Sequence, residues 1–303
     1  MSGMMRNMMG GGMMRKGMMS SMTLMTKWMN GETLPVDLDT PKPVQNKDSI
    51  NKGGIIFKDR CAVCHGLKGD GKGEKAKDLL TKPADFTSGI FKFRSVKDIA
   101  PADVDLFRTV SRGLHGTAML PWPGLTTLEK WQVVYYIKSF TDLFEDEQAP
   151  EFVKVPKTVR TETEYIAQGS AVYKKAKCYE CHGHEGYGDG EKADKLKDDW
   201  QRPIRPRNFR EQMLKRGVGV EEIYLTIATG LNGTPMLSFS HVLKDDEMLA
   251  LAFYIQSIAR KPSKGGMMMG MVKMSTDERT GMMTDMPGMP MGQGMMMQKM
   301  PGE

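Results

Sequence analysis

The sequence predicts an all-α protein built from two similar domains in tandem, with a methionine-rich tail at each end. Three observations support this prediction: an internal repeat, apolar residues at helical spacing in both copies, and an uneven distribution of methionine. Of the 30 methionines, 12 lie in residues 1–29 and 14 in residues 267–300, which leaves four in the body of the chain. The two ends therefore differ in composition from the residues between them.

The repeat appears when the second half of the chain is placed under the first at an offset of 117 residues. CAVCHGLKGDGKG at position 61 then aligns with CYECHGHEGYGDG at 178, and HGTAMLPW at 115 aligns with NGTPMLSF at 232. Each copy spans about 100 residues, an ordinary size for a domain. We expect a tail that is disordered or bound to a partner at 1–50, a first domain at 51–141, a linker at 142–163, a second domain at 164–260 and a second tail at 261–303.

Each copy carries the same order of expected helices. A first helix, at 53–60 or 169–177, leads into the cysteine motif, and a middle helix reads ADVDLFRTVSRG or VEEIYLTIATG, ending in a glycine suited to a C-terminal cap. In the first copy a last helix begins at Thr126, where Glu129 completes a capping box. Three short helices bury little apolar surface, so a large flat apolar cofactor would complete each core.

All four cysteines occur in two C-x-x-C-H motifs. Thiols at positions i and i+3 of a helical turn project on one side, where both can bond the vinyl groups of one porphyrin, and the adjoining imidazole then reaches the iron. We therefore expect two haem c groups. Their ligands would be Cys61, Cys64 and His65 for the first haem, and Cys178, Cys181 and His182 for the second.

Two of the four methionines in the body of the chain occupy equivalent positions. Met119 lies 54 residues after His65, Met236 lies 54 residues after His182, and both occur in the sequence G-T-x-M-L. A thioether favours ferrous iron and raises the reduction potential relative to a second histidine. We predict that Met119 and Met236 are the second axial ligands of the two irons.

This pattern resembles the class I cytochromes c, and more closely the two-haem periplasmic cytochromes built from two fused class I domains. The resemblance covers residues 51–260, with its two CxxCH motifs, its GTAML and GTPML loops and its terminal helices ending YYIKSF and FYIQSI. It implies that the first and last helices of each domain cross near the haem. It also implies three contacts to haem propionates, from Arg94, Trp122 and Arg207.

These features predict an electron carrier and not an enzyme, because two six-coordinate irons leave no position for a substrate. The carrier would pass single electrons between a periplasmic donor and a terminal reductase or oxidase, either alone or within a larger respiratory complex. Haem attachment of this type places it in the periplasm or another extracytoplasmic compartment. No apolar run approaches the roughly 20 residues that span a bilayer, so any membrane association would be peripheral. Its net charge of +6 comes from scattered lysines, which does not favour nucleic-acid binding.

Several alternatives remain open at this stage. The four cysteines could bind zinc or act as a redox dithiol, although both interpretations leave the adjoining histidines unexplained. A two-haem peroxidase would need one iron with an open sixth position. A copper-handling protein would bind Cu(I) through the thioethers of its tails. Three further histidines have no counterpart in the other copy, and we expect them at the surface or in loops: His115, His184 and His241.

Overall fold

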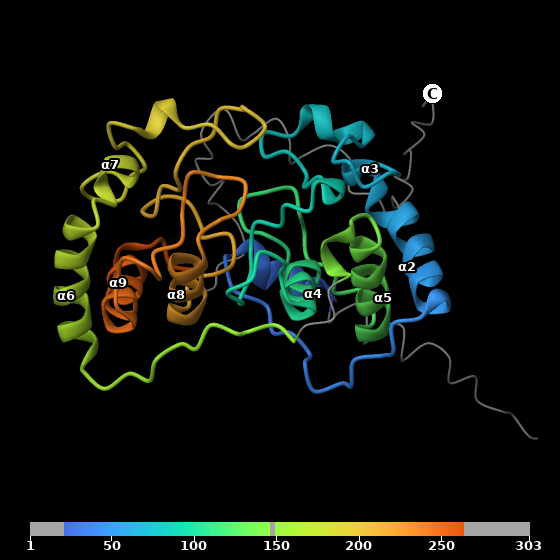
Figure 1. Ribbon diagram of the computed structural model, residues 1–303, viewed down its shortest axis with the longest axis horizontal. Helices are drawn as coiled ribbons and strands as arrows, with labels where there is room; N and C mark the ends of the chain where they lie inside the picture. The colour runs from blue at the N-terminus through green and yellow to red at the C-terminus, as the bar shows by residue number, and fades with distance from the viewer. Residues whose placement is uncertain (1–20, 146–148, 264–303) are drawn as a thin grey trace, which may run out of the picture.

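The computed structural model describes residues 21–145 and 149–263, and this part of the chain contains helices and no strand. Two isolated β-bridges, Val96 with Phe152 and Lys197 with Pro203, are the β-type pairings within it. Figure 1 shows two helical domains side by side, and the prediction of an all-α tandem fold is confirmed. The remainder of the two methionine-rich tails, 1–20 and 264–303, lies outside the described residues.

The two domains have the same order of elements. In each, a long helix leads into a single turn that carries the CxxCH motif, and two further α-helices follow after an irregular stretch. The first domain contains α2 (Lys47–Arg60), α3 (Ala62–His65), η1 (Glu74–Asp78), η2 (Phe86–Ser88), α4 (Asp103–Arg112), α5 (Thr127–Lys138) and η3 (Asp142–Phe144). The second contains α6 (Glu162–Lys175), α7 (Tyr179–His182), η4 (Ala193–Lys195), α8 (Val220–Thr229) and α9 (Asp245–Ile258).

Glycine allows the first and last helices of each domain to cross closely. A Cβ atom at Gly53 of α2 would lie 1.9 Å from the carbonyl oxygen of Gln132 in α5, and one at Gly169 of α6 would lie 2.0 Å from that of Ala250 in α9. Real Cβ atoms do not approach backbone this closely, so only glycine fits at either crossing. The expected crossing of the terminal helices is therefore present in both domains.

Local capping explains where several helices begin. The Thr126 hydroxyl accepts a hydrogen bond from the Glu129 amide at 3.2 Å, and the Glu129 carboxylate accepts one from the Thr126 amide at 2.8 Å. Thr161 and Glu164 form the same capping box at the start of α6. Such boxes satisfy amide groups that have no partner within the helix.

Each domain has a separate hydrophobic core. The core of the first is centred on Phe57, Phe107, Trp131 and Tyr135, and the core of the second on Tyr165, Tyr173, Tyr224 and Leu249. In the first domain the rings of Phe107 and Trp131 stack at 4.1 Å between centroids. Because each copy of the repeat buries its own set of apolar side chains, the two copies form two domains.

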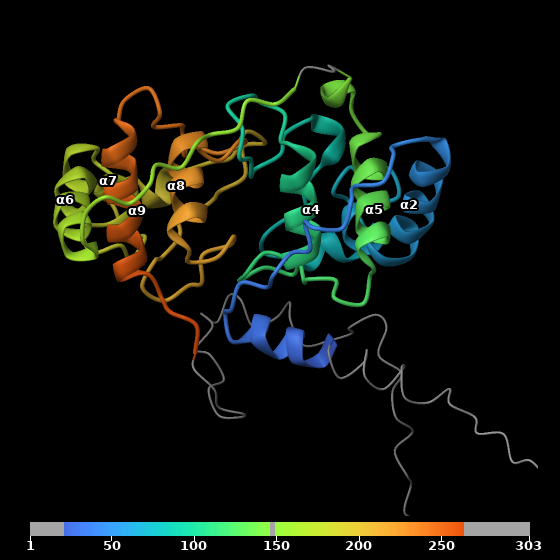
Figure 2. The same cartoon turned by 90° about the horizontal axis from the view of Figure 1, so that it is seen from below.

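Part of the segment that we expected as a disordered or partner-bound tail packs on the first domain. Residues 21–29 form a helix, which Figure 2 shows below α4. Its Trp28 is buried, as is Leu34, whose carbonyl oxygen accepts a hydrogen bond from the Arg112 Nε at 2.9 Å. Further along, the Tyr135 hydroxyl donates to the Pro43 carbonyl. Buried apolar side chains therefore hold residues 21–50 against the first domain, and a tail that is disordered or bound to a partner at 1–50 stays a prediction.

Candidate haem sites

Each CxxCH histidine is held by a backbone carbonyl group. The Nδ1 atom of His65 lies 3.2 Å from the Ala84 carbonyl oxygen, and the Nδ1 atom of His182 lies 3.2 Å from the Arg207 carbonyl oxygen. A carbonyl oxygen only accepts hydrogen bonds, so Nδ1 carries the proton in both rings. The Nε2 lone pair of each ring is then available to a metal, and the bond fixes the orientation of the ring.

An aromatic side chain lies flat against each of these imidazoles. Phe86 stacks on His65 with 4.7 Å between ring centroids, and Phe209 stacks on His182 with 4.5 Å. Burial lowers the pKa of both histidines. It thereby favours the neutral imidazole, which is the form that binds iron.

The four thiols are free and partly buried. Burial raises the pKa of Cys61 to about 12 and that of Cys178 to about 11, and it also raises the pKa of Cys64 and of Cys181. A redox-active dithiol has a lowered thiol pKa, so these values argue against the dithiol interpretation. One C-x-x-C pair lies at α3 and the other at α7, on opposite sides of the molecule (Figure 1), so they do not form one four-cysteine zinc site.

The two methionine loops have the same backbone structure. The Leu114 amide donates to the Met119 carbonyl at 2.8 Å, and the Leu231 amide donates to the Met236 carbonyl at 2.8 Å. In both loops a threonine two residues before the methionine accepts from the methionine amide, at 3.1 and 3.2 Å. Both methionines are partly buried. Their role as axial ligands stays a prediction. The equivalent hydrogen bonds of the two loops support it.

The three expected propionate contacts lie in different surroundings. Arg94 is buried and donates to residues of the second domain, while its Nε atom is buried without a partner. Trp122 is partly buried against the core of the first domain. The Nη1 atom of Arg207 donates to the Gln212 side chain at 2.9 Å. Contact with a propionate stays a prediction for all three residues.

Of the three remaining histidines, His184 and His241 are exposed, as expected, whereas His115 is buried. Trp28 covers the His115 ring, with ring centroids 5.0 Å apart. Burial lowers the pKa of His115 to about 4. Its loop position is as expected.

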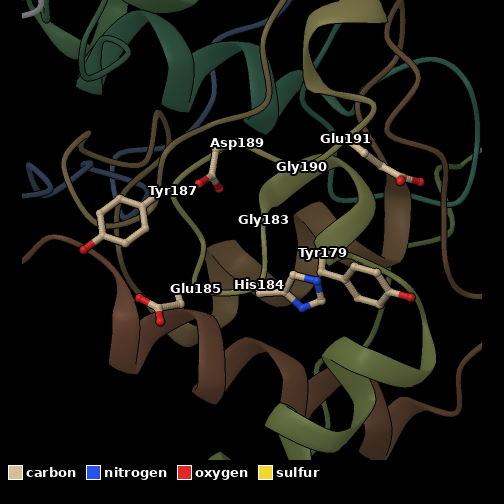
Figure 3. A pocket seen from close by; sticks show the side chains of 8 residues that line it. All are labelled: Tyr179, Gly183, His184, Glu185, Tyr187, Asp189, Gly190 and Glu191. Carbon is tan, nitrogen blue, oxygen red and sulfur yellow. The ribbon is translucent and has the colours of Figure 1, made fainter.

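A cavity of about 390 Å³ lies beside the second CxxCH motif, where His184 stacks on Tyr179 at 4.5 Å (Figure 3). Two tyrosines and three carboxylates give it a polar lining. The lining residues are Tyr179, Gly183, His184, Glu185, Tyr187, Asp189, Gly190 and Glu191.

Sequence reasoning missed the carbonyl acceptors and the stacked aromatic rings. Ala84 and Phe86 belong to PADF, and Arg207 and Phe209 belong to PRNF, two stretches at equivalent places in the repeat. The repeated P-x-x-F pattern was therefore the available signal, although a backbone acceptor has no side-chain signature of its own.

The donor set of each domain fits one covalently bound haem. One thiol caps the start of a single helical turn and the other lies within it, and the turn ends in an imidazole with Nε2 available. A methionine loop of the same type follows in both domains. Cys61, Cys64 and His65 would hold the first group, and Cys178, Cys181 and His182 the second.

Comparisons with known proteins agree with this assignment. The family model described as Cytochrome c matches residues 50–141 and, separately, residues 166–259. The solved structure of the Kuenenia stuttgartiensis reducing HAO-like protein complex Kustc0457/Kustc0458 contains a similar chain, with 39% sequence identity and a TM-score of 0.66. The match covers 73% of this chain and 99% of that chain. None of the curated proteins compared with the chain matches it. The chain belongs to the cytochrome c family, as a tandem two-domain class I member whose domains carry covalently bound haem for electron transfer.

Proposed function

We propose that this protein is a dihaem electron carrier that passes single electrons between redox protein partners through two His/Met-ligated haems. The observation that supports the proposal is the equivalence of the two sites. In each, a carbonyl oxygen lies 3.2 Å from the imidazole Nδ1, and a methionine loop is closed by a 2.8 Å backbone hydrogen bond. A haem in each site supplies a one-electron iron couple.

The histidine and the methionine of each domain would supply two ligands to the iron of a bound haem. The Nδ1 hydrogen bonds to Ala84 and Arg207 increase the basicity of the coordinating nitrogen and prevent rotation of the ring. The methionine loops would close the opposite face with a neutral sulfur, which favours the reduced state. Two closed sites favour a carrier over a peroxidase, which needs an open iron.

The similar chain from the reducing HAO-like complex suggests the type of partner. We propose that this protein works as an electron-transfer subunit of a comparable oxidoreductase assembly, in the periplasm or another extracytoplasmic compartment. Its net charge of +6 favours a partner with an acidic docking surface. None of the helices in the described part of the chain is long and apolar enough to cross a bilayer.

The optical spectrum of the haem-loaded protein tests the proposal. Both irons should be low-spin, and the far-red band that arises from methionine-to-iron charge transfer should have the strength of two haems. A band of half that strength together with a high-spin component would mean that one iron is open, and the peroxidase alternative would then be the better description.

A second candidate function is Cu(I) binding by the methionine-rich tails. The Ser263 amide donates to the Asn30 carbonyl at 2.9 Å, so the last described residue of the chain is bonded next to the helix over residues 21–29. Met22 and Met29 of that helix are exposed. Thioethers are soft ligands that suit Cu(I). Titration with Cu(I) should show binding by the full chain and none after leucine replaces the methionines in 1–29 and 267–300, and equal uptake by both would refute this function.

A further inference from the structure

We infer that each methionine loop is positioned by residues outside its own domain, and that Arg94 of the first domain is the positioning residue for Met236 of the second. The inference rests on the proposed function, since it takes Met236 as an iron ligand. It goes beyond that function because it assigns to Arg94 a role in the haem site of the opposite domain.

The guanidinium of Arg94 crosses the domain boundary and holds the start of the second methionine loop. Its Nη2 atom donates to the carbonyl of Thr229, the last residue of α8, at 2.6 Å. Its Nη1 atom donates to the Asn232 side-chain oxygen, four residues before Met236. The Asn232 side-chain nitrogen donates in turn to the Ile99 carbonyl of the first domain at 3.3 Å. The first domain is thus bound to the end of α8 at Thr229 and to the loop at Asn232.

Buried charged groups hold Arg94 in place from the other side. The Arg216 Nη1 atom donates to the Arg94 carbonyl at 3.2 Å, and its Nη2 atom lies 3.7 Å from the Asp105 carboxylate. That carboxylate also accepts from the amides of Ser95 and Ala102, at 2.8 and 3.1 Å. A buried charge without such partners costs free energy of folding, so none of these side chains can move without breaking the contacts of the others. The cluster therefore forms a rigid support for the second loop.

The first methionine loop has a matching arrangement. His115 occupies the position equivalent to Asn232, and its amide donates to the carbonyl of Lys215 in the second domain at 3.1 Å. Its ring is covered by Trp28, which belongs to neither repeat. Both loops therefore lie at the boundary between the domains, and each depends on groups that its own repeat does not supply.

This arrangement makes a specific claim about Arg94. If it were only a propionate contact of its own domain, its replacement would change the first haem. If it positions Met236, its replacement changes the second haem and leaves the first as it was. The identity of the responding haem therefore separates the two roles.

The experiment uses the full-length, haem-loaded protein with Arg94→Lys and Arg94→Ala. The far-red band and the two midpoint potentials are measured, and each signal is assigned to its haem with Met119→Ala and Met236→Ala. We expect Arg94→Ala to remove much of the second haem's share of the band and to lower its potential, with the first haem unchanged. Arg94→Lys should have a smaller effect than Arg94→Ala, because the ammonium group keeps the charge and can donate to one of the two acceptors, although it cannot bind both as the guanidinium does. Arg160→Ala, at an exposed arginine of the linker paired with Asp246, is the control and should change neither haem.

A response confined to the first haem, or no response from either, would overturn the inference. Should Arg94→Ala fail to fold, Asn232→Ala removes the same contact from the second domain and should change the same haem. If Arg94→Ala does fold, the double variant of Arg94→Ala and Asn232→Ala should lose less than the sum of the two single changes, because both remove one interaction. A wild-type protein without a two-haem band would refute the proposed function itself, and that result is read before any variant is made.

Discussion

The indole of Trp28 stacks on the imidazole of His115, with 5.0 Å between ring centroids and 19° between ring planes. Trp28 lies in a helix that precedes both repeats, and His115 lies four residues before Met119. Both side chains are buried, with 4% and 5% of their surface exposed. The helix over residues 21–29 therefore forms part of the surroundings of the first methionine loop.

Replacing Trp28 by alanine should destabilise the first methionine loop. Removal of a buried tryptophan side chain costs about 3–5 kcal/mol, and here it also uncovers His115. We expect a loss of that order in the free energy of unfolding and a weaker far-red band from the first haem, while the second haem keeps its band. Phe152→Ala, at an aromatic residue that is 49% exposed, is the control. Equal losses in the two variants would show that the stacking has no special role.

The buried His115 should make the protein less stable in acid. Burial lowers its pKa to about 4 in the folded protein, whereas the ordinary value is 6.5. As the pH falls below 6.5 the unfolded chain therefore binds this proton first, so the stability that is fully present above pH 6.5 is lost progressively until pH 4. The complete loss amounts to about 3 kcal/mol.

Denaturant unfolding at pH 7 and at pH 4.5 measures this effect when wild type is compared with His115→Phe. Phenylalanine keeps a ring to stack on Trp28 but cannot bind a proton, so the variant should lose less stability between the two pH values. His241→Phe, at an exposed histidine, should behave as the wild type does. If His115→Phe shows the same pH dependence as the wild type, a different group is responsible.

Replacing Met236 by alanine should open the second iron to water or small ligands. Loss of the thioether removes the ligand that favours ferrous iron, so the potential of the second haem should fall while the first stays nearly unchanged. Redox titration and ligand binding monitored by absorbance measure both effects. Met213→Ala removes a methionine from the same domain that lies outside the GTPML loop, and it should leave both potentials in place. Unchanged potentials in Met236→Ala would mean that Met236 is not the ligand.

Replacing Gly53 by alanine should destabilise the first domain, because the new Cβ would lie 1.9 Å from the Gln132 carbonyl oxygen and force α2 away from α5. Overpacking of this kind costs about 1–3 kcal/mol and sometimes more. Gly124→Ala is the matched control, since a Cβ there would meet nothing within 4 Å. Thermal unfolding of the two variants measures the effect, and Gly53→Ala should melt at the lower temperature. Equal melting temperatures would contradict the packing argument.

Much of the fold and of the candidate sites could be predicted because the signals are local. The CxxCH motifs place two thiols and an imidazole within a single helical turn, and Thr126 with Glu129 marks a helix start within four residues. Repetition strengthened these signals, since Met119 and Met236 stand at the same distance from their histidines. Short-range geometry of this kind depends on bond lengths and helical pitch, which the rest of the protein changes little.

Contacts between distant segments were decided only by the tertiary structure. Nothing in the neighbourhood of Arg94 indicates that its guanidinium reaches Thr229 and Asn232, about 135 residues later in the chain. Nor does the composition of residues 21–50 show that Trp28 becomes buried on His115. Such pairings depend on how two folded domains and a flanking helix pack together, and complementary surfaces exist only after each part has folded. The sequence by itself determined the two cytochrome c domains and the CxxCH motif in each, because these signals are local, whereas packing between the domains decided which groups contact the methionine loops.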